Sequence, residues 1–348
     1  MPHLLSRVGT LALMVISLTP AAWADAQGVH IEPQEKWTNV FADREVEFHF
    51  AVEAAGAFRG RAAWAVTLGR RTVPGSPGEK SIAAAPGTPA RLTVRLRTPQ
   101  LKPGVILRAL LTVSVYREGQ DKPDAVHERT LWLFPADPFA DRRQWLKDLK
   151  LTLFDPAQTT VAAFKKIDLP FETIDNPATI GDLKEGLLII GEATSFRDYP
   201  EVPERMVQAA ARGLPVLCLA PTDGILAVPG ADEAHLPAPA SLSWRRQDVI
   251  ADLDKRLDAL GWPPDSRMGG GILVLKAYEN RVVAEVAKEG TGWHWFEIRF
   301  GNQGRLVVCG FALTGKPWDA GPTPRFLLAR LLEHVTSKDS AVSADAMK

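Results

Sequence analysis

The run LKLTLF at Leu149–Phe154 begins the stretch that decides the fold, and GLLIIG at Gly186–Gly191 and PVLCLA at Pro215–Ala220 continue it. Each run is continuously apolar, which is typical of strands buried on both faces of a parallel sheet. Segments with helical spacing of apolar residues lie between them, at Thr159–Lys166 and Val202–Arg212. Strands that alternate with amphipathic helices predict an α/β domain with a flavodoxin-like open sheet, which we place at residues 149–336.

The residues after this stretch extend the same domain. Asp248–Leu260 has helical spacing, and Thr222–Ser241 is rich in Pro, Ala and Gly, which predicts a long loop at the sheet edge. Further strands and a closing helix are expected at Gly271–Tyr278, Arg281–Ala287, Trp293–Phe300, Arg305–Leu313 and Pro324–Val335.

Residues 28–134 have a different pattern. Short runs that alternate between polar and apolar residues, such as EVEFHFAV at Glu45–Val52 and RLTVRLR at Arg91–Arg97, are separated by Pro- and Gly-rich turns. This pattern predicts an antiparallel β-sandwich of immunoglobulin type, with Trp64 and Trp132 in its core. Residues 135–148 are expected to be a linker, in which Phe139 and Trp145 dock the two domains.

The first residues are typical of a secretory signal peptide. Arg7 precedes the apolar run Leu11–Leu18, and Ala22-Trp23-Ala24 is a small-residue cleavage site. A membrane anchor is the alternative, but the run is too short to span a bilayer. We therefore expect residues 1–24 to be removed. The mature protein is then expected to be secreted or periplasmic and to have no membrane span. The polar residues 337–348 are expected to form a disordered tail.

Charge and cysteine content exclude some classes of protein. The 41 Lys and Arg residues balance 41 Asp and Glu residues, so no net field recruits nucleic acid. Cys218 and Cys309 lie inside apolar runs and are expected to be buried free thiols. A disulfide bond between the two cysteines is the alternative, and it requires that their strands are neighbours in the sheet.

The second domain resembles a class I glutamine amidotransferase-like domain. More closely, it is similar to the noncatalytic modules of this type in secreted carbohydrate-related bacterial proteins. Four segments carry the resemblance: LKLTLFDP at 149–156, GLLIIGE at 186–192, AARGLPVLCLAP at 210–221, and GRLVVCGFAL at 304–313 with PRFLLARLL at 324–332.

The catalytic residues of the active family members are not matched. Those members place a Cys between glycines on a tight strand-to-helix elbow and pair it with a His and a Glu two residues apart. Here Cys218 is flanked by Leu217 and Leu219, and His294 and Glu297 are three residues apart on a predicted strand. The resemblance therefore implies a domain without amidotransferase catalysis.

Acidic residues follow the predicted parallel strands. Asp155, Glu192 and Asp223 come after three successive strands, with Thr194 and Thr222 beside them. Ligands of open α/β sheets bind at this edge, so these five residues are the candidate ligand site, with Glu192 at its centre. The alternative is that they cap helices and form turns. No cofactor or metal is expected, since no His and Cys have metal-ligand spacing.

These observations lead to three hypotheses about function. The first is a secreted, noncatalytic binding or accessory protein, for which the resemblance implies carbohydrate or cell-envelope partners. The second is a hydrolase that uses the carboxylates at the sheet edge as acid or base. The third is a structural subunit of an envelope assembly, which an exposed apolar patch would favour.

Overall fold

The computed structural model describes residues 28–228, 239–264, 273–277, 282–286, 293–301 and 303–337. The predicted signal peptide, most of the predicted C-terminal tail and the middle of the predicted loop at 222–241 lie outside these residues. Within the described residues, no helix is both long enough and apolar enough to cross a membrane.

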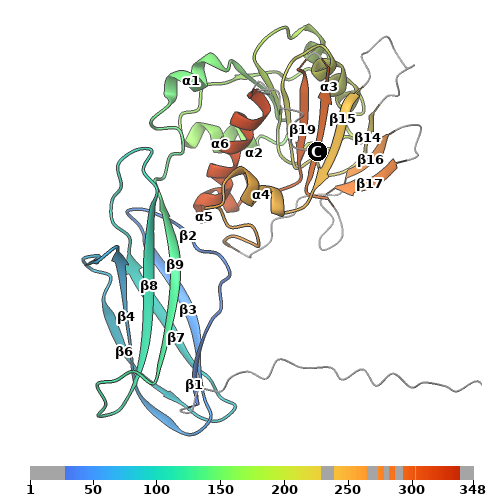
Figure 1. Cartoon of the computed structure of the whole chain (residues 1–348). Coiled ribbons are helices and arrows are strands. Elements are labelled where there is room, and N and C mark those ends of the chain that lie inside the picture. Colours follow the sequence, from blue (N-terminus) through green and yellow to red (C-terminus); the bar gives the residue numbers. More distant parts are fainter. Residues whose placement is uncertain are drawn as a thin grey trace, which may run out of the picture.

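The N-terminal part is a sandwich of two sheets (Figure 1). One sheet has the order β1 (Val29–Pro33), β3 (Glu45–Ala54), β7 (Ala90–Arg97). The other has the order β2 (Asn39–Phe41), β9 (Ala125–Phe134), β8 (Leu107–Arg117), β4 (Phe58–Leu68), β5 (Arg71–Thr72), and β6 (Gly78–Ala84) pairs with β4. Inward-facing residues of both sheets form one core, so the predicted β-sandwich is confirmed.

The two tryptophans expected in this core have different positions. Trp64 is half-buried against the sandwich core, and its indole N–H donates to the Arg95 carbonyl at 3.3 Å. The prediction for Trp132 is wrong, because it packs instead against the core of the C-terminal part. Its neighbours Leu131 and Leu133 face inward, so the alternation of the strand turns Trp132 outward, toward the other half of the chain.

A seven-stranded sheet organises the C-terminal part. Its order is β11 (Glu172–Thr173), β10 (Leu151–Phe154), β12 (Leu187–Ile190), β13 (Val216–Leu219), β19 (Arg305–Cys309), β18 (Trp295–Phe300), β15 (Pro239–Arg245). The first five strands are parallel, and β18 and β15 continue the sheet in antiparallel pairing. The three central runs of the sequence are thus adjacent parallel strands, as predicted.

Helices cover both faces of this sheet. One face packs on α2 (Thr159–Lys166), α4 (Asp248–Leu253) and α6 (Pro322–Thr336). The other packs on α3 (Val202–Ala211) and the 3₁₀ helix η1 (Pro177–Asp182). Because both faces are covered, every residue of β10, β12, β13 and β19 is buried, which explains the continuously apolar runs.

Three predicted boundaries are corrected. The helix expected at Asp248–Leu260 ends at Leu253, because Asp254 is extended and its carboxylate binds Arg256 and Arg330. The expected loop at 222–241 contains β14 (Ile225–Val228) and the start of β15, and β14 belongs to a small sheet with β16 (Leu273–Ala277) and β17 (Val282–Val286). The linker contains the short helix α1 (Arg143–Asp148), and α5 (Pro317–Ala320) precedes α6.

Buried contacts join the two parts of the chain. The Asp258 carboxylate accepts hydrogen bonds from the Thr38 backbone N–H at 2.8 Å, the Thr38 hydroxyl at 2.7 Å and the Asn39 backbone N–H at 2.8 Å. Asn39 in turn accepts from the Asp258 backbone N–H at 2.6 Å and the Thr323 hydroxyl at 3.0 Å. Phe139 is fully buried in the same apolar cluster as Phe134, which confirms its predicted docking role.

Candidate functional site

The two cysteines lie on opposite faces of the seven-stranded sheet. Both thiols are free and fully buried, as predicted, Cys218 in the cluster under α3 and Cys309 in the cluster under α6. In the pairing of β13 with β19, Cys218 is opposite Val308 and Cys309 is opposite Leu219, so the thiols point away from each other. Burial raises the pKa of Cys218, and it raises that of Cys309 to about 12. Neither group is placed as a nucleophile at an edge.

The His and Glu that come nearest to the amidotransferase pair have separate environments. The His294 ring stacks on Phe311 with centroids 5.3 Å apart, and its Nδ1 is buried without a partner in the described part of the chain. Glu297 Oε2 lies 2.9 Å from His334 Nε2, and its Oε1 accepts from Arg299 Nε at 2.6 Å. Glu297 therefore serves an ion-pair network between β18 and the end of α6.

Asp155 is buried at the start of α2. Its Oδ2 accepts the Val161 backbone N–H at 2.8 Å, which satisfies one of the N–H groups that the first turn of the helix leaves open. Its Oδ1 lies against Gly191, where a Cβ atom would come within 2.4 Å, and has no partner among the described residues. Burial raises the pKa of Asp155 although backbone hydrogen bonds from Val161 and Thr160 oppose the rise.

Glu192 is bonded to the chain segment that follows β19. Its Oε2 accepts the backbone N–H of Leu313 at 2.8 Å, the backbone N–H of Thr314 at 2.6 Å and the Thr314 hydroxyl at 2.8 Å. Its own backbone N–H donates to the Thr160 hydroxyl at 2.8 Å. At the ends of β10 and β12, Glu192 therefore binds groups of the chain itself.

Thr194 is also used inside the chain. Its hydroxyl donates to the Gly191 carbonyl at 2.7 Å, its side chain is fully buried, and its carbonyl accepts the Thr222 N–H at 3.1 Å. This bond holds the segment after β12 beside the segment after β13. Gly224 has φ +91°, and a Cβ atom there would come within 2.6 Å of the Phe196 Cβ, so only glycine fits this close approach.

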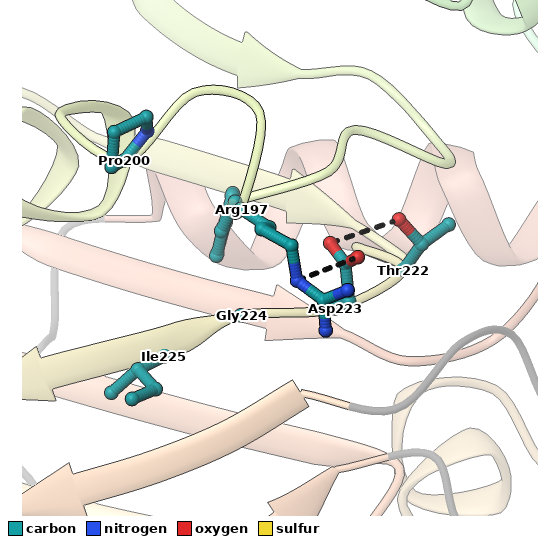
Figure 2. A pocket seen from close by; sticks show the side chains of 7 residues that line it. Arg197, Pro200, Thr222, Asp223, Gly224 and Ile225 are labelled. Atoms are coloured by element: carbon teal, nitrogen blue, oxygen red, sulfur yellow. Dashed lines mark hydrogen bonds and ion pairs between the residues drawn. The ribbon is translucent and has the colours of Figure 1, made fainter.

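An open pocket of about 870 Å³ lies where these two segments meet, and Figure 2 shows its lining. Asp223 and Arg197 lie side by side in its lining, with Arg197 Nε 3.8 Å from Asp223 Oδ2. The hydrogen bond from the Ser195 hydroxyl is the main cause that lowers the pKa of Asp223. The other lining residues are Phe196, Pro200, Thr222, Gly224 and Ile225.

The five predicted site residues therefore do not form one site. Thr222 and Asp223 line the open pocket, whereas Asp155, Glu192 and Thr194 are buried and hydrogen-bonded within the chain. Sequence reasoning missed Arg197, Pro200 and Ile225. Arg197 is five residues beyond Glu192 in an irregular segment, and no pattern in the sequence shows that this segment meets residues 222–225.

Within the described residues, no group of three or more His, Cys, Asp and Glu side chains is arranged to hold a metal ion. The pocket beside Asp223 offers one carboxylate and one guanidinium, a set that suits hydrogen bonding to a polar organic ligand better than coordination of a cation.

Comparisons with known proteins give distant likenesses. No family model matches the chain, and no curated protein matches it. A chain from the complex of zinc 2-glycoprotein with prolactin inducible protein, from human seminal plasma, is 12% identical with a TM-score of 0.23, covering 32% of this chain and 98% of that one. A β-glucuronidase of glycoside hydrolase family 2 is 11% identical with a TM-score of 0.23, covering 56% and 20%. A family 123 glycoside hydrolase from Clostridium perfringens is 7% identical with a TM-score of 0.22, covering 63% and 42%.

These and other neighbours are immunoglobulin-like β-sandwich domains and carbohydrate-related glycoside hydrolases, all at low identity. A glutamine amidotransferase-like family is not shown by the comparisons. Because TM-scores this low do not establish a shared fold, we draw no conclusion about function from them.

Proposed function

We propose that this chain is an exported, noncatalytic binding or accessory protein whose C-terminal part binds carbohydrate at the open pocket beside Asp223. One observation carries the proposal. The pocket at the sheet edge has the half-exposed carboxylate of Asp223 and an exposed guanidinium, whereas the two neighbouring carboxylates, Asp155 and Glu192, are buried and accept backbone hydrogen bonds.

The strand order supports a flavodoxin-like, amidotransferase-like domain. The parallel strands β11-β10-β12-β13-β19 have the order 2-1-3-4-5 in chain sequence, which is the order of flavodoxin-like sheets. Such sheets bind ligands beyond the carboxyl ends of their strands. The pocket lies at that end, one strand away from the position where the order reverses. The resemblance to noncatalytic modules of secreted proteins agrees with the buried thiol at Cys218.

The chemistry of the pocket fits a sugar. Asp223 accepts hydrogen bonds and Arg197 donates them, so the pair can bind two neighbouring hydroxyl groups. Pro200 and the half-exposed Ile225 offer apolar surface to the face of a ring. Export to a secreted or periplasmic location rests on the signal-like order of residues 1–24, and cell-envelope partners rest on the resemblance alone.

The alternative is a hydrolase that uses carboxylates as acid or base, and the environment of Asp155 favours it. Its Oδ1 is buried without a partner in the described part, and burial raises its pKa, as a general acid requires. It would need to be uncovered to reach a substrate. A structural subunit has less support, since the large exposed apolar residues among those described are four separate positions: Val105, Val126, Ile225 and Leu260.

We expect Asp223→Asn to weaken sugar binding. Short oligosaccharides of glucose, xylose and N-acetylglucosamine are screened against the full chain, and any that binds is titrated by calorimetry. Loss of one charge-assisted hydrogen bond weakens binding by about tenfold. Asp198→Asn is the matched control, because Asp198 is exposed in the same segment and does not line the pocket. Equal affinity of the parent and Asp223→Asn would place the site elsewhere.

A further inference from the structure

A second hollow, of about 780 Å³, lies on the outer face of the sandwich, over β3 and β7. The small side chain of Ala51 sits opposite Arg91 in the pairing of these strands, and His49 sits opposite Thr93. The turn Gly87-Thr88-Pro89 borders the hollow. A small residue between larger neighbours leaves a depression on the sheet face, and its volume lies in the range of small-molecule sites.

His49 is held in one orientation at the rim. Its Nδ1 lies 2.6 Å from Glu35 Oε1, and its backbone N–H donates to both Glu35 oxygens at 3.0 Å. The Glu35 side chain is only 13% exposed, so its carboxylate is used by His49 and is not among the groups that line the hollow. A carboxylate at Nδ1 fixes the ring and leaves Nε2 to contact a ligand.

Arg91 is the charged group of the hollow that lacks a counter-ion. Within the described residues, no carboxylate lies within ion-pair distance of it, whereas Arg95, four residues further along β7 on the same face, pairs with Glu47 at 2.7 Å. No Asp or Glu lines the hollow; Glu32, opposite Ala51 on β1, is outside the lining. The remaining polar groups are the amide of Gln34 and the hydroxyls of Thr88 and Thr93.

We propose that this hollow binds a sugar acid. The planar fork of the Arg91 guanidinium matches a carboxylate, and Gln34, Thr88, Thr93 and His49 Nε2 are hydrogen-bonding groups for ring hydroxyls. The site is independent of the pocket beside Asp223, since it lies on the other part of the chain. The sandwich then contributes its own recognition of a sugar acid, in addition to joining the C-terminal part.

The test is a titration of the full chain with glucuronate and with galacturonate, followed by amide NMR shifts, with glucose as the uncharged probe. We expect saturable shifts at Thr88 and Thr93 with at least one of the acids, and weaker binding of glucose. Arg91→Gln should lower the affinity for the acid by about tenfold or more, because the variant loses a bidentate charged contact. Arg95→Gln, the matched control on the same strand, and Asp223→Asn should leave it unchanged.

Binding of neither acid would overturn the proposal, and so would equal affinity of the parent and Arg91→Gln. Because Asp223→Asn changes only the C-terminal pocket and Arg91→Gln changes only the hollow on the sandwich, the two binding proposals can fail independently. Arg91 is exposed, so its replacement is expected to preserve the fold, which the unchanged NMR spectrum of the free variant checks.

Discussion

Replacement of Glu297 by Ala is expected to lower the free energy of unfolding by about 3–5 kcal/mol, the cost of breaking a buried ion pair by removing one partner. Glu297 and Arg305 are each about 95% buried, and Glu297 Oε1 lies 3.3 Å from Arg305 Nε. The same carboxylate binds Arg299 and His334. Its loss removes one shared partner of these three side chains at the junction of β18 with the end of α6. Urea denaturation at neutral pH measures the change.

The same carboxylate predicts a dependence of stability on pH. Burial alone would raise its pKa, but His334 and Arg299 outweigh burial and lower it to about 2, from 4.5 for the free side chain. The lowered pKa adds stability that is present above about pH 4.5 and is lost as the pH falls toward 2. Glu297→Gln should therefore lose less stability than the parent between pH 5 and pH 3.

Glu79→Ala is the control for the Glu297 variants. Its exposed ion pair with Arg61, at 3.4 Å, is expected to contribute less than about 1 kcal/mol. If Glu297→Ala lowers the free energy of unfolding no more than Glu79→Ala does, the stabilising role of the Glu297 network is contradicted.

Replacement of Glu192 by Ala is expected to cost about 2–4 kcal/mol of stability. The backbone N–H groups of Leu313 and Thr314 would lose their acceptor in a buried place, and each unsatisfied donor costs about 1–3 kcal/mol. Thermal unfolding measures the loss, with Glu201→Ala as control, since Glu201 is exposed and its side chain makes no capping hydrogen bond to α3. An unchanged melting temperature together with lost sugar binding would instead make Glu192 a ligand-binding residue.

The central strands and helix starts were predictable because they depend on local patterns. Helices begin at Thr159 and Val202 as expected, and β10, β12 and β13 lie inside the predicted runs. The end of α4 was not predictable, since the partner of Asp254 is Arg330, far along the chain. The strand β6 was missed because the segments on both sides of it are rich in Pro and Gly and indicate turns. The position of Trp132 was wrong because the alternation of a strand does not show what its outward face contacts.

The candidate site was predictable only in outline. Strand ends place Asp155, Glu192 and Asp223 at one edge of the sheet, as the sequence indicates. What each carboxylate does depends on partners that are distant in sequence, such as residues 313 and 314 for Glu192. Asp223 remains at an open pocket, where the segment that meets it supplies the exposed Arg197.

The most direct test of noncatalytic binding is the fate of a bound oligosaccharide. One that binds the parent at the Asp223 pocket is incubated with the full chain over a range of pH, and mass spectrometry follows its length. We predict that it is recovered intact, because Asp155 and Glu192 are enclosed by the chain and Cys218 is buried. Cleavage that persists in pure protein and disappears in Asp155→Asn would contradict the proposal and establish the carboxylate hydrolase.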